Sequence, residues 1–112
     1  MSSLGDPIEE LTIGAVRVIV RYGCVRRDQY ELLASQPFPA ELEGRLAALG
    51  TRRGSPILYT VDVEGVHQLT VAPTRGRLVI MPRLRVERAA QRAAALAVAE
   101  LVAAALTDDA RG

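Results

Sequence analysis

The chain of 112 residues has very few of the residues that most reactive sites are built from. It contains one cysteine, Cys24, and one histidine, His67. A single cysteine excludes an intramolecular disulfide framework and a cysteine-rich zinc cluster. The sequence also lacks the G-x-G-x-x-G, P-loop and C-x-x-C motifs of nucleotide and metal sites. We therefore expect no metal and no cofactor.

Aromatic side chains are also scarce, because tryptophan is absent and only three tyrosines and one phenylalanine occur. Alanine is abundant instead, so the core has to be built from small groups, and each of these contributes little transfer free energy. We expect a marginally stable monomer that gains from self-association. Lysine is absent too, and we attribute the arginine-only composition to a GC-rich bacterial genome. The net charge of +1 selects neither nucleic acid nor a membrane as partner.

No targeting segment is evident in the sequence. The first ten residues are acidic and lack the positive segment and apolar run of a signal peptide. The longest apolar run, 93–106, is too short and too weakly hydrophobic to suggest a membrane span. We therefore expect a cytoplasmic bacterial protein without membrane contact.

The hydrophobic periodicity predicts an α+β domain with a four-stranded, mainly antiparallel sheet and helices packed on one face. The expected order of elements is strand, helix, strand, strand, strand, helix. The strands are expected at 12–22, 57–63, from about 66 to 72, and 77–81. Short helical segments are expected at 26–34 and 39–49, the second with Leu42, Leu46 and Leu49 as an inward-facing stripe. A polar turn is expected at 51–56 and a long helix at 85–106. The domain spans 12–106, between a flexible N-terminal segment, 1–11, and a flexible tail, 107–112.

The register of the central hairpin can be predicted from its apolar residues. A two-residue loop at Glu64-Gly65 would place Val61 opposite Gln68, an apolar residue opposite a polar one. A three-residue loop instead places Val61 on the same face as the apolar residues of the following strand. We expect the three-residue loop, with Gly65 at a positive φ, because a slip of one residue exchanges the two faces of a strand.

The long last helix holds ten alanines and is apolar on nearly every side. Such a helix must bury more than one face. One wide apolar face is expected to cover the sheet: Val86, Ala90, Ala94, Ala97, Val98, Leu101, Val102 and Ala105. A second face carries small and apolar residues at 3-4-3 spacing, which we call the seam: Leu96, Ala99, Ala103 and Leu106. A basic rim of Arg85, Arg88 and Arg92 precedes it. We expect the seam to bind a partner, although it can instead pack under residues 26–49 of the same chain.

These features predict a non-catalytic small adaptor or regulatory subunit that acts through protein contacts. The partner is a second copy of the chain or another subunit, with a signalling protein or nucleotide switch as one candidate. The seam would supply affinity, and the basic rim would orient an acidic partner and speed its association.

Two alternatives remain open. The arginines at the start of the last helix suit a nucleic-acid-binding module, and the order of a helix, a three-stranded meander and a helix is also that of double-stranded-RNA-binding domains. The neutral net charge and Glu87 among the arginines count against it. A small enzyme would need an unusual site around His67, Asp62 and Cys24, and no nucleophile motif supports one. We interpret Asp62 and Glu64 as a solvated sheet face, and Arg52-Arg53-Gly54-Ser55 as a solvated turn rather than a phosphate cradle.

Overall fold

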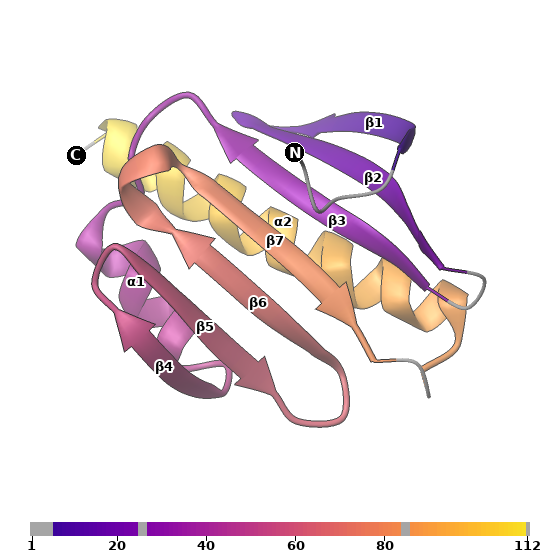
Figure 1. Ribbon diagram of the computed structural model, residues 1–112. Helices are drawn as coiled ribbons and strands as arrows, with labels where there is room; N and C mark the ends of the chain where they lie inside the picture. Colours follow the sequence, from indigo (N-terminus) through magenta and orange to yellow (C-terminus); the bar gives the residue numbers. More distant parts are fainter. Residues whose placement is uncertain (1–5, 25–26, 84–85, 112) are drawn as a thin grey trace.

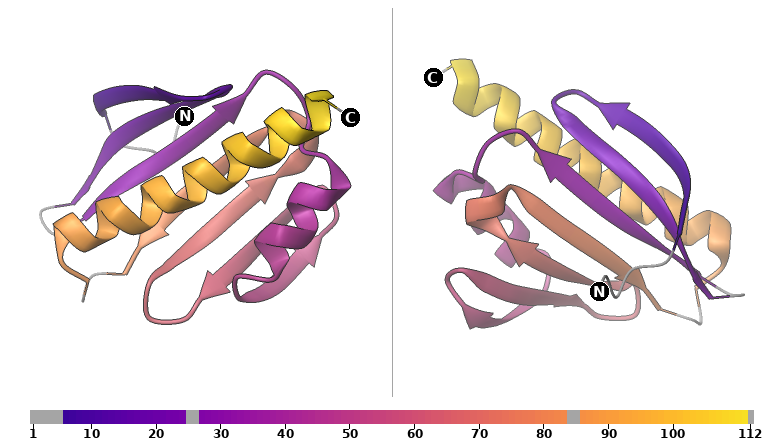
Figure 2. Two further views of the ribbon diagram at one scale, coloured as in Figure 1. Left: turned by 180° about the vertical axis from the view of Figure 1, so that it is seen from behind. Right: turned by 45° about the horizontal axis from the view of Figure 1, so that its top comes forward.

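The computed structural model describes residues 6–24, 27–83 and 86–111, and within them the chain forms an α+β fold. One antiparallel sheet has the strand order β1-β2-β3-β7-β6-β5-β4. Helices α1 and α2 lie side by side against the same face of this sheet (Figures 1 and 2). The elements are β1 (Pro7–Ile13), β2 (Val16–Cys24), β3 (Arg27–Ala34), α1 (Ala40–Ala47), β4 (Thr51–Ser55), β5 (Leu58–Val63), β6 (His67–Ala72), the short 3-10 helix η1 (Pro73–Arg75), β7 (Arg77–Pro82) and α2 (Arg88–Arg111).

The expected α+β class is confirmed, but the prediction of four strands is wrong, because the sheet has seven. One added strand comes from the N-terminal segment expected to be loose. The alternating stretch expected as a single strand at 12–22 turns back at Gly14-Ala15, so that Ile13 pairs with Val16. Gly14 has a φ of 58°, which suits the first position of a two-residue hairpin turn. Residues 7–11 therefore lie in β1, whereas residues 1–5 lie outside the described part of the chain.

The other two added strands are β3 and β4. The segment expected as two helical turns at 26–34 is β3, which pairs with β2 on one side and β7 on the other. Its buried residues Tyr30 and Leu32 follow the two-residue period of a strand, and pairing on both edges overrides the helix propensity of its Gln, Glu, Leu and Ala residues. The expected polar turn at 51–56 is mostly β4, an edge strand whose side chains are all exposed.

The register predicted for the central hairpin is confirmed. Val63 pairs with His67 across a three-residue loop, so that Val61 faces Leu69 and Tyr59 faces Val71. Gly65 in this loop has a φ of 76°, a conformation that glycine adopts without steric cost. The apolar residues of β5 and β6 therefore share the face that the helices cover.

The core lies between the sheet and the two helices. Alternate residues of the inner strands point toward the helices and are buried: Val16, Val18, Val20, Tyr30, Leu32, Tyr59, Val61, Leu69, Val71, Leu78 and Ile80. The helix α1 contributes Leu42 and Leu46, as expected from its leucine stripe, and Leu49 lies beyond its end and is exposed. Because of this alternation, the remaining residues of each strand form the opposite face of the sheet.

The helix α2 is longer than predicted, and its buried stripe overlaps only partly with the predicted one, in Val98, Val102 and Ala105. It runs from Arg88 to Arg111, through most of the segment expected as a flexible tail. It contacts β1, β2, β3, β7 and α1. Its buried residues are Gln91, Ala95, Val98, Ala99, Val102, Ala103, Ala105 and Leu106. Ala90 and Ala97, which were expected to cover the sheet, are exposed.

The seam lies mostly inside the fold. Ala99, Ala103 and Leu106 have exposed fractions of 0%, 7% and 2%, and Leu96 is half-buried. The small residues allow a close approach, as expected, but to the turn between β1 and β2: a methyl group added at Gly14 would lie 3.2 Å from Cβ of Ala103. The seam is therefore part of this chain's own core rather than an exposed surface.

By length and composition alone, one stretch of α2, Arg88–Thr107, is apolar enough to cross a membrane. Of this stretch 44% is buried inside the fold, and core helices of soluble proteins can be equally long and apolar. It is therefore weak evidence for membrane insertion.

Candidate interaction surface on the helix-free sheet face

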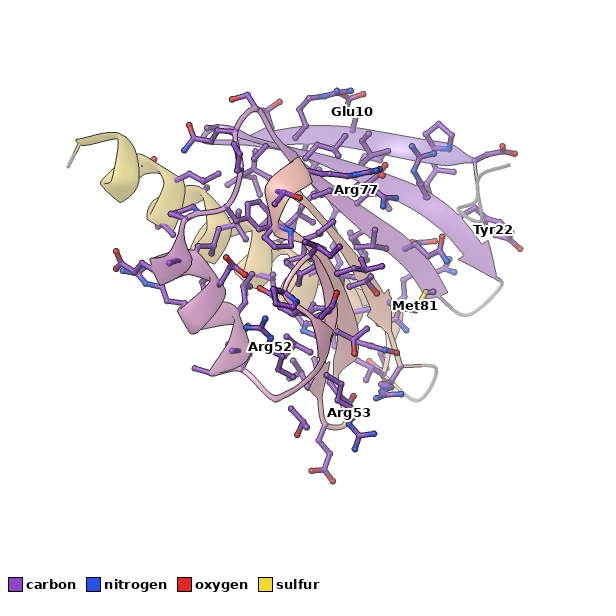
Figure 3. All side chains as sticks on the ribbon, turned by 60° about the vertical axis from the view of Figure 1, so that its left-hand side comes forward. Glu10, Tyr22, Arg52, Arg53, Arg77 and Met81 are labelled. Atoms are coloured by element: carbon purple, nitrogen blue, oxygen red, sulfur yellow. The ribbon has the colours of Figure 1, made fainter. Side chains whose placement is uncertain are left out.

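The second face of the sheet carries no helix, as the view along the layers shows (Figure 3). Strand pairing arranges its side chains in three rows that cross the sheet. The first row is Thr12, Arg17, Leu33, Arg77, Ala72, Leu58 and Ser55; the second is Glu10, Ile19, Glu31, Val79, Thr70, Thr60 and Arg53; the third is Pro7, Arg21, Gln29, Met81, Gln68, Asp62 and Thr51. An antiparallel sheet commonly leaves one face open in this way. We call this surface the helix-free face.

Ion pairs join most of the charged groups on the helix-free face. Glu31, in the middle row, binds Arg21 at 3.0 Å and Arg77 at 2.7 Å, one arginine from each neighbouring row. Arg17 binds Glu10 at 2.8 Å near the β1 edge, and Arg83, which follows β7, binds Asp62. Together with Arg53 on β4, five arginines face three carboxylates, which leaves the surface moderately basic.

The pKa of Glu31 is set by two opposed effects. Burial would raise the pKa of this carboxyl group, but the hydrogen bonds from Arg77 and Arg21, together with their positive charges, lower it below its ordinary value. Glu31 is therefore ionised at neutral pH, and its ion pairs connect β3 to β2 and β7. We assign Glu31 a structural role in the sheet, because its exposed fraction is only 6%.

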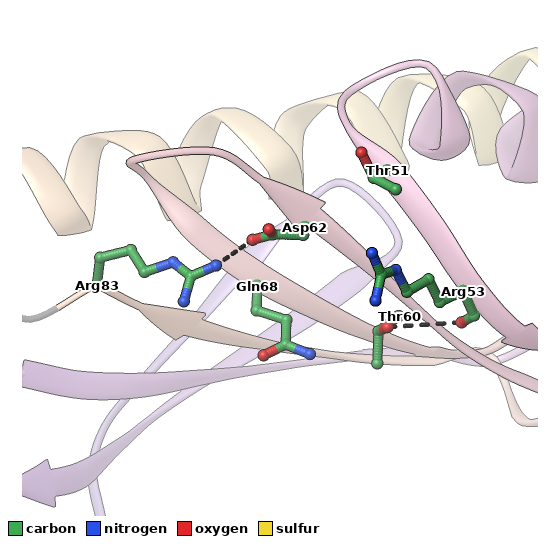
Figure 4. Close-up of a pocket in the computed structure, with 6 residues that line it drawn as sticks. All are labelled: Thr51, Arg53, Thr60, Asp62, Gln68 and Arg83. Carbon is green, nitrogen blue, oxygen red and sulfur yellow. Dashed lines mark hydrogen bonds and ion pairs between the residues drawn. The ribbon is translucent and has the colours of Figure 1, made fainter.

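One hollow lies over the β4–β5–β6 part of the helix-free face, next to the end of β7. It has a volume of about 270 Å³ and is lined by Thr51, Arg53, Thr60, Asp62, Gln68 and Arg83. All six side chains are polar, and they come from four different segments (Figure 4). We call this the polar hollow.

A second hollow lies at the opposite end of β5. It has a volume of about 480 Å³ and is lined by Ile57, Leu58, Ala72, Thr74, Arg75 and Arg77. Ile57 and Leu58 are 68% and 55% exposed, and Ile57 is the most exposed large hydrophobic residue of the described chain. Ser55 holds the turn that presents them, since the Leu58 amide donates to Ser55 Oγ at 3.2 Å. We call this the apolar hollow.

The arginines of the expected basic rim bind acids of the same chain. Both oxygens of Glu9 on β1 accept hydrogen bonds from Arg92, at 2.6 and 2.9 Å. Arg88 lies 3.7 Å from Asp28 on β3. Arg85 lies outside the described residues. Arg88 and Arg92 therefore fasten α2 to the first half of the sheet, which the sequence did not predict.

His67 lies on the helix-facing side of β6 and is 3% exposed. Its Nδ1 atom has no hydrogen-bond partner among the described residues. Burial and the positive charge of Arg83 lower the pKa of the imidazole, so it is neutral at pH 7. His67 is therefore a neutral, enclosed side chain on the side of the sheet that the helices cover.

Arg52 and Arg53 point to opposite faces of β4, because successive side chains alternate along a strand. Arg52 lies on the side of α1, with its guanidinium 3.9 Å from the centre of the Tyr59 ring, whereas Arg53 lines the polar hollow. Burial, together with the nearby Glu43 carboxylate, raises the pKa of Tyr59 to about 12. The two arginines cannot act together on one phosphate, and Asp62 lies on the helix-free face as expected.

Sequence reasoning missed both hollows, since they depend on β4 and on the order of the strands. The exposed Ile57-Leu58 pair was assigned to a strand, and no local signal marks it as a surface. The described residues contain no group of three or more metal-binding side chains.

The chain matches no protein-family model, no curated protein and no solved structure at a significant level of similarity.

Proposed function

We propose that this protein is a non-catalytic module that binds another protein at the apolar hollow. A single observation carries the proposal: two large aliphatic residues that are neighbours in the chain are both exposed, Ile57 in the turn between β4 and β5 and Leu58 at the start of β5. They adjoin a hollow that Arg75 and Arg77 border. Isolated exposed leucines are common on protein surfaces, but a pair beside a hollow is a typical feature of a contact site.

The physical chemistry of the apolar hollow favours a partner segment that has aliphatic and acidic side chains. Complete burial of one aliphatic side chain is worth about 1.5–3 kcal/mol, so Ile57 and Leu58 can supply most of a modest affinity. Arg75 makes no ion pair within the described chain, and its guanidinium is available to a carboxylate. Arginine is also enriched among the residues that dominate interface energies.

This proposal keeps the expected adaptor role and assigns it to a different surface. The seam on α2 is not available to a partner, because three of its four residues are buried. Nucleic-acid binding through Arg88 and Arg92 has less support, because Asp28 and Glu9 already bind these side chains.

The proposal can be tested with the double variant Ile57→Ser, Leu58→Ser. We expect affinity purification from the native cell, followed by mass spectrometry, to recover a protein with the wild-type chain and not with this variant. The matched control is Ile8→Ser, Leu49→Ser, which alters two other exposed aliphatic residues. Equal recovery with the wild type and both variants would remove the apolar hollow as the binding surface. Unchanged thermal unfolding would show that the loss is local.

A further inference from the structure

The polar hollow is distinct from the proposed protein-binding surface. It lies at the opposite end of β5, and none of its lining residues is apolar. Asp62 and Arg83 occupy its side near β7, and Arg53 and Thr60 occupy its side near the β4 edge (Figure 4). The Thr60 hydroxyl is oriented by the Arg53 carbonyl oxygen, to which it donates at 3.5 Å. The side chains are therefore partly fixed before any ligand binds.

The charges of the polar hollow do not balance. Asp62 binds Arg83 through its Oδ1 atom. Arg53 makes no ion pair with any residue that the structure describes. The hollow therefore has an excess of one positive charge, located on a side chain whose planar fork matches a carboxylate in a bidentate manner. The carboxylate group of a ligand would balance the charge of Arg53.

The volume restricts the size of a ligand. Sites for drug-sized molecules usually occupy about 300–1,000 Å³, and the polar hollow falls below this range at about 270 Å³. Its ligand would therefore be smaller than a typical drug-sized molecule. Because the lining contains no apolar side chain, affinity would come from hydrogen bonds and charge rather than from hydrophobic burial.

The carboxylate of Asp62 further restricts the chemical class of the ligand. Asp62 would repel a second negative charge, which disfavours phosphate dianions. Its Oδ2 atom takes no part in the bond to Arg83 and can accept a hydrogen bond from a ligand. A hydroxyl or amino group beside the ligand's carboxylate would supply that hydrogen.

We propose that the polar hollow binds a small monocarboxylate with an adjacent hydrogen-bond donor, the chemical class of the α-hydroxy and α-amino acids. Arg53 binds the carboxylate, and Asp62, held in place by Arg83, accepts the hydrogen of the hydroxyl or amino group. Gln68 and Thr51 supply further hydrogen-bonding groups. This inference does not depend on the proposed protein-binding function, because it concerns other residues.

The test is an NMR titration of the 15N-labelled protein with glycolate and glycine. Propionate lacks the donor, ethylamine lacks the carboxylate, and inorganic phosphate carries too much charge, so these three serve as comparison probes. We expect saturable shifts of the Gln68 side-chain amide and the Arg53 Nε signal with glycolate or glycine, and much weaker responses to the other three. Equal responses to glycolate and propionate, or no saturable response at all, would overturn the proposal.

Substitutions at Arg53 and Asp62 test the contact that each residue makes with the ligand. We expect Arg53→Gln to weaken glycolate binding by about tenfold or more, as for the loss of a charge-assisted hydrogen bond. Asp62→Asn is expected to remove the preference for glycolate over propionate. The control, Arg17→Gln, alters an arginine elsewhere on the helix-free face and should leave binding unchanged. The proposal is also refuted if Arg17→Gln weakens binding as much as Arg53→Gln. The Ile57→Ser, Leu58→Ser variant should bind glycolate normally, which separates this site from the proposed protein contact.

Discussion

Arg77 on β7 donates a hydrogen bond of 2.7 Å to Glu31 on β3, across a separation of 46 residues in the chain. Arg21 on β2 donates to the other carboxylate oxygen of Glu31 at 3.1 Å. The three side chains lie on the helix-free face, where β3 joins the first three strands of the sheet to the last four. The interaction therefore connects the two halves of the molecule at their common border.

Replacing Glu31 with glutamine should destabilise the fold. The substitution keeps the shape of the side chain but leaves two guanidiniums without their carboxylate, and both can be only partly rehydrated. We expect the free energy of unfolding to fall by about 1–2 kcal/mol, measured by urea denaturation. The control, Glu10→Gln, breaks an exposed ion pair with Arg17 and should change stability by less than about 0.5 kcal/mol. Similar losses in both variants would mean that Glu31 has no special role.

The lowered pKa of Glu31 also predicts how the stability of the fold depends on pH. The folded-state pKa of Glu31 is lowered, so the unfolded chain takes up a proton first as the pH falls. The stabilisation by Glu31 is complete above its unfolded value of about 4.5 and is lost as the pH falls through the lower folded value. Glu31→Gln should therefore lose less stability than the wild type on acidification below pH 4.5.

Ala99 on α2 provides a test of the buried seam. Its side chain is fully enclosed, so Ala99→Leu would overfill the core and should cost about 1–3 kcal/mol in the free energy of unfolding. Ala104→Leu, on an exposed position of the same helix, should change stability by no more than about 0.5 kcal/mol. Denaturation curves and the mass in solution should be measured for both. A change in mass without a change in stability would contradict the burial of Ala99.

His67 predicts how stability changes between pH 7 and pH 5. Its folded pKa is lowered by burial and by Arg83, so below pH 6.5 the unfolded chain binds more protons than the folded one. Stability is complete above pH 6.5 and falls with decreasing pH, by at most about 1.4 kcal/mol per pH unit for one proton. His67→Leu should remove most of this slope in urea denaturation. Because the chain has no other histidine, an unchanged slope would contradict the buried, neutral state of His67.

Where apolar alternation was strong, the sequence was sufficient to predict local structure. The hairpin of β5 and β6 is an example, because only a three-residue loop kept Val61 and Leu69 on one face. The leucine stripe of α1 was likewise predicted, since Leu42 and Leu46 lie one helical turn apart and are both buried.

The errors arose where side-chain contrast was weak or where distant pairing determined the structure. In β3, Gln, Glu, Leu and Ala favour a helix in isolation, and only pairing with β2 and β7 makes a strand of them. In β4, no buried residue marks a period. In α2, alanine on every side left the orientation undetermined, and the polar Gln91 belongs to the buried stripe. The side chain of Gln91 donates to the Val86 carbonyl oxygen at 2.7 Å, which accounts for its burial.

The candidate sites were harder to predict from the sequence than the fold was. Arg53 and Arg83 are separated by thirty positions. They line one hollow only because β5 and β6 lie between β4 and β7, with the start of β4 and the end of β7 at the same end of these strands. The exposure of Leu58 likewise follows from its place on the helix-free face rather than from its neighbours in sequence.

The strand order also determines when the sheet can be completed during synthesis on the ribosome. The first three strands pair with their neighbours in the chain, and so do the last four, but β3 must wait for β7 before its second edge is occupied. Closure of so long a loop is slow compared with the folding of a hairpin. Until β7 emerges, a nascent chain exposes the β3 edge and the apolar side that α2 later covers. This intermediate would therefore either bind chaperones or aggregate prematurely.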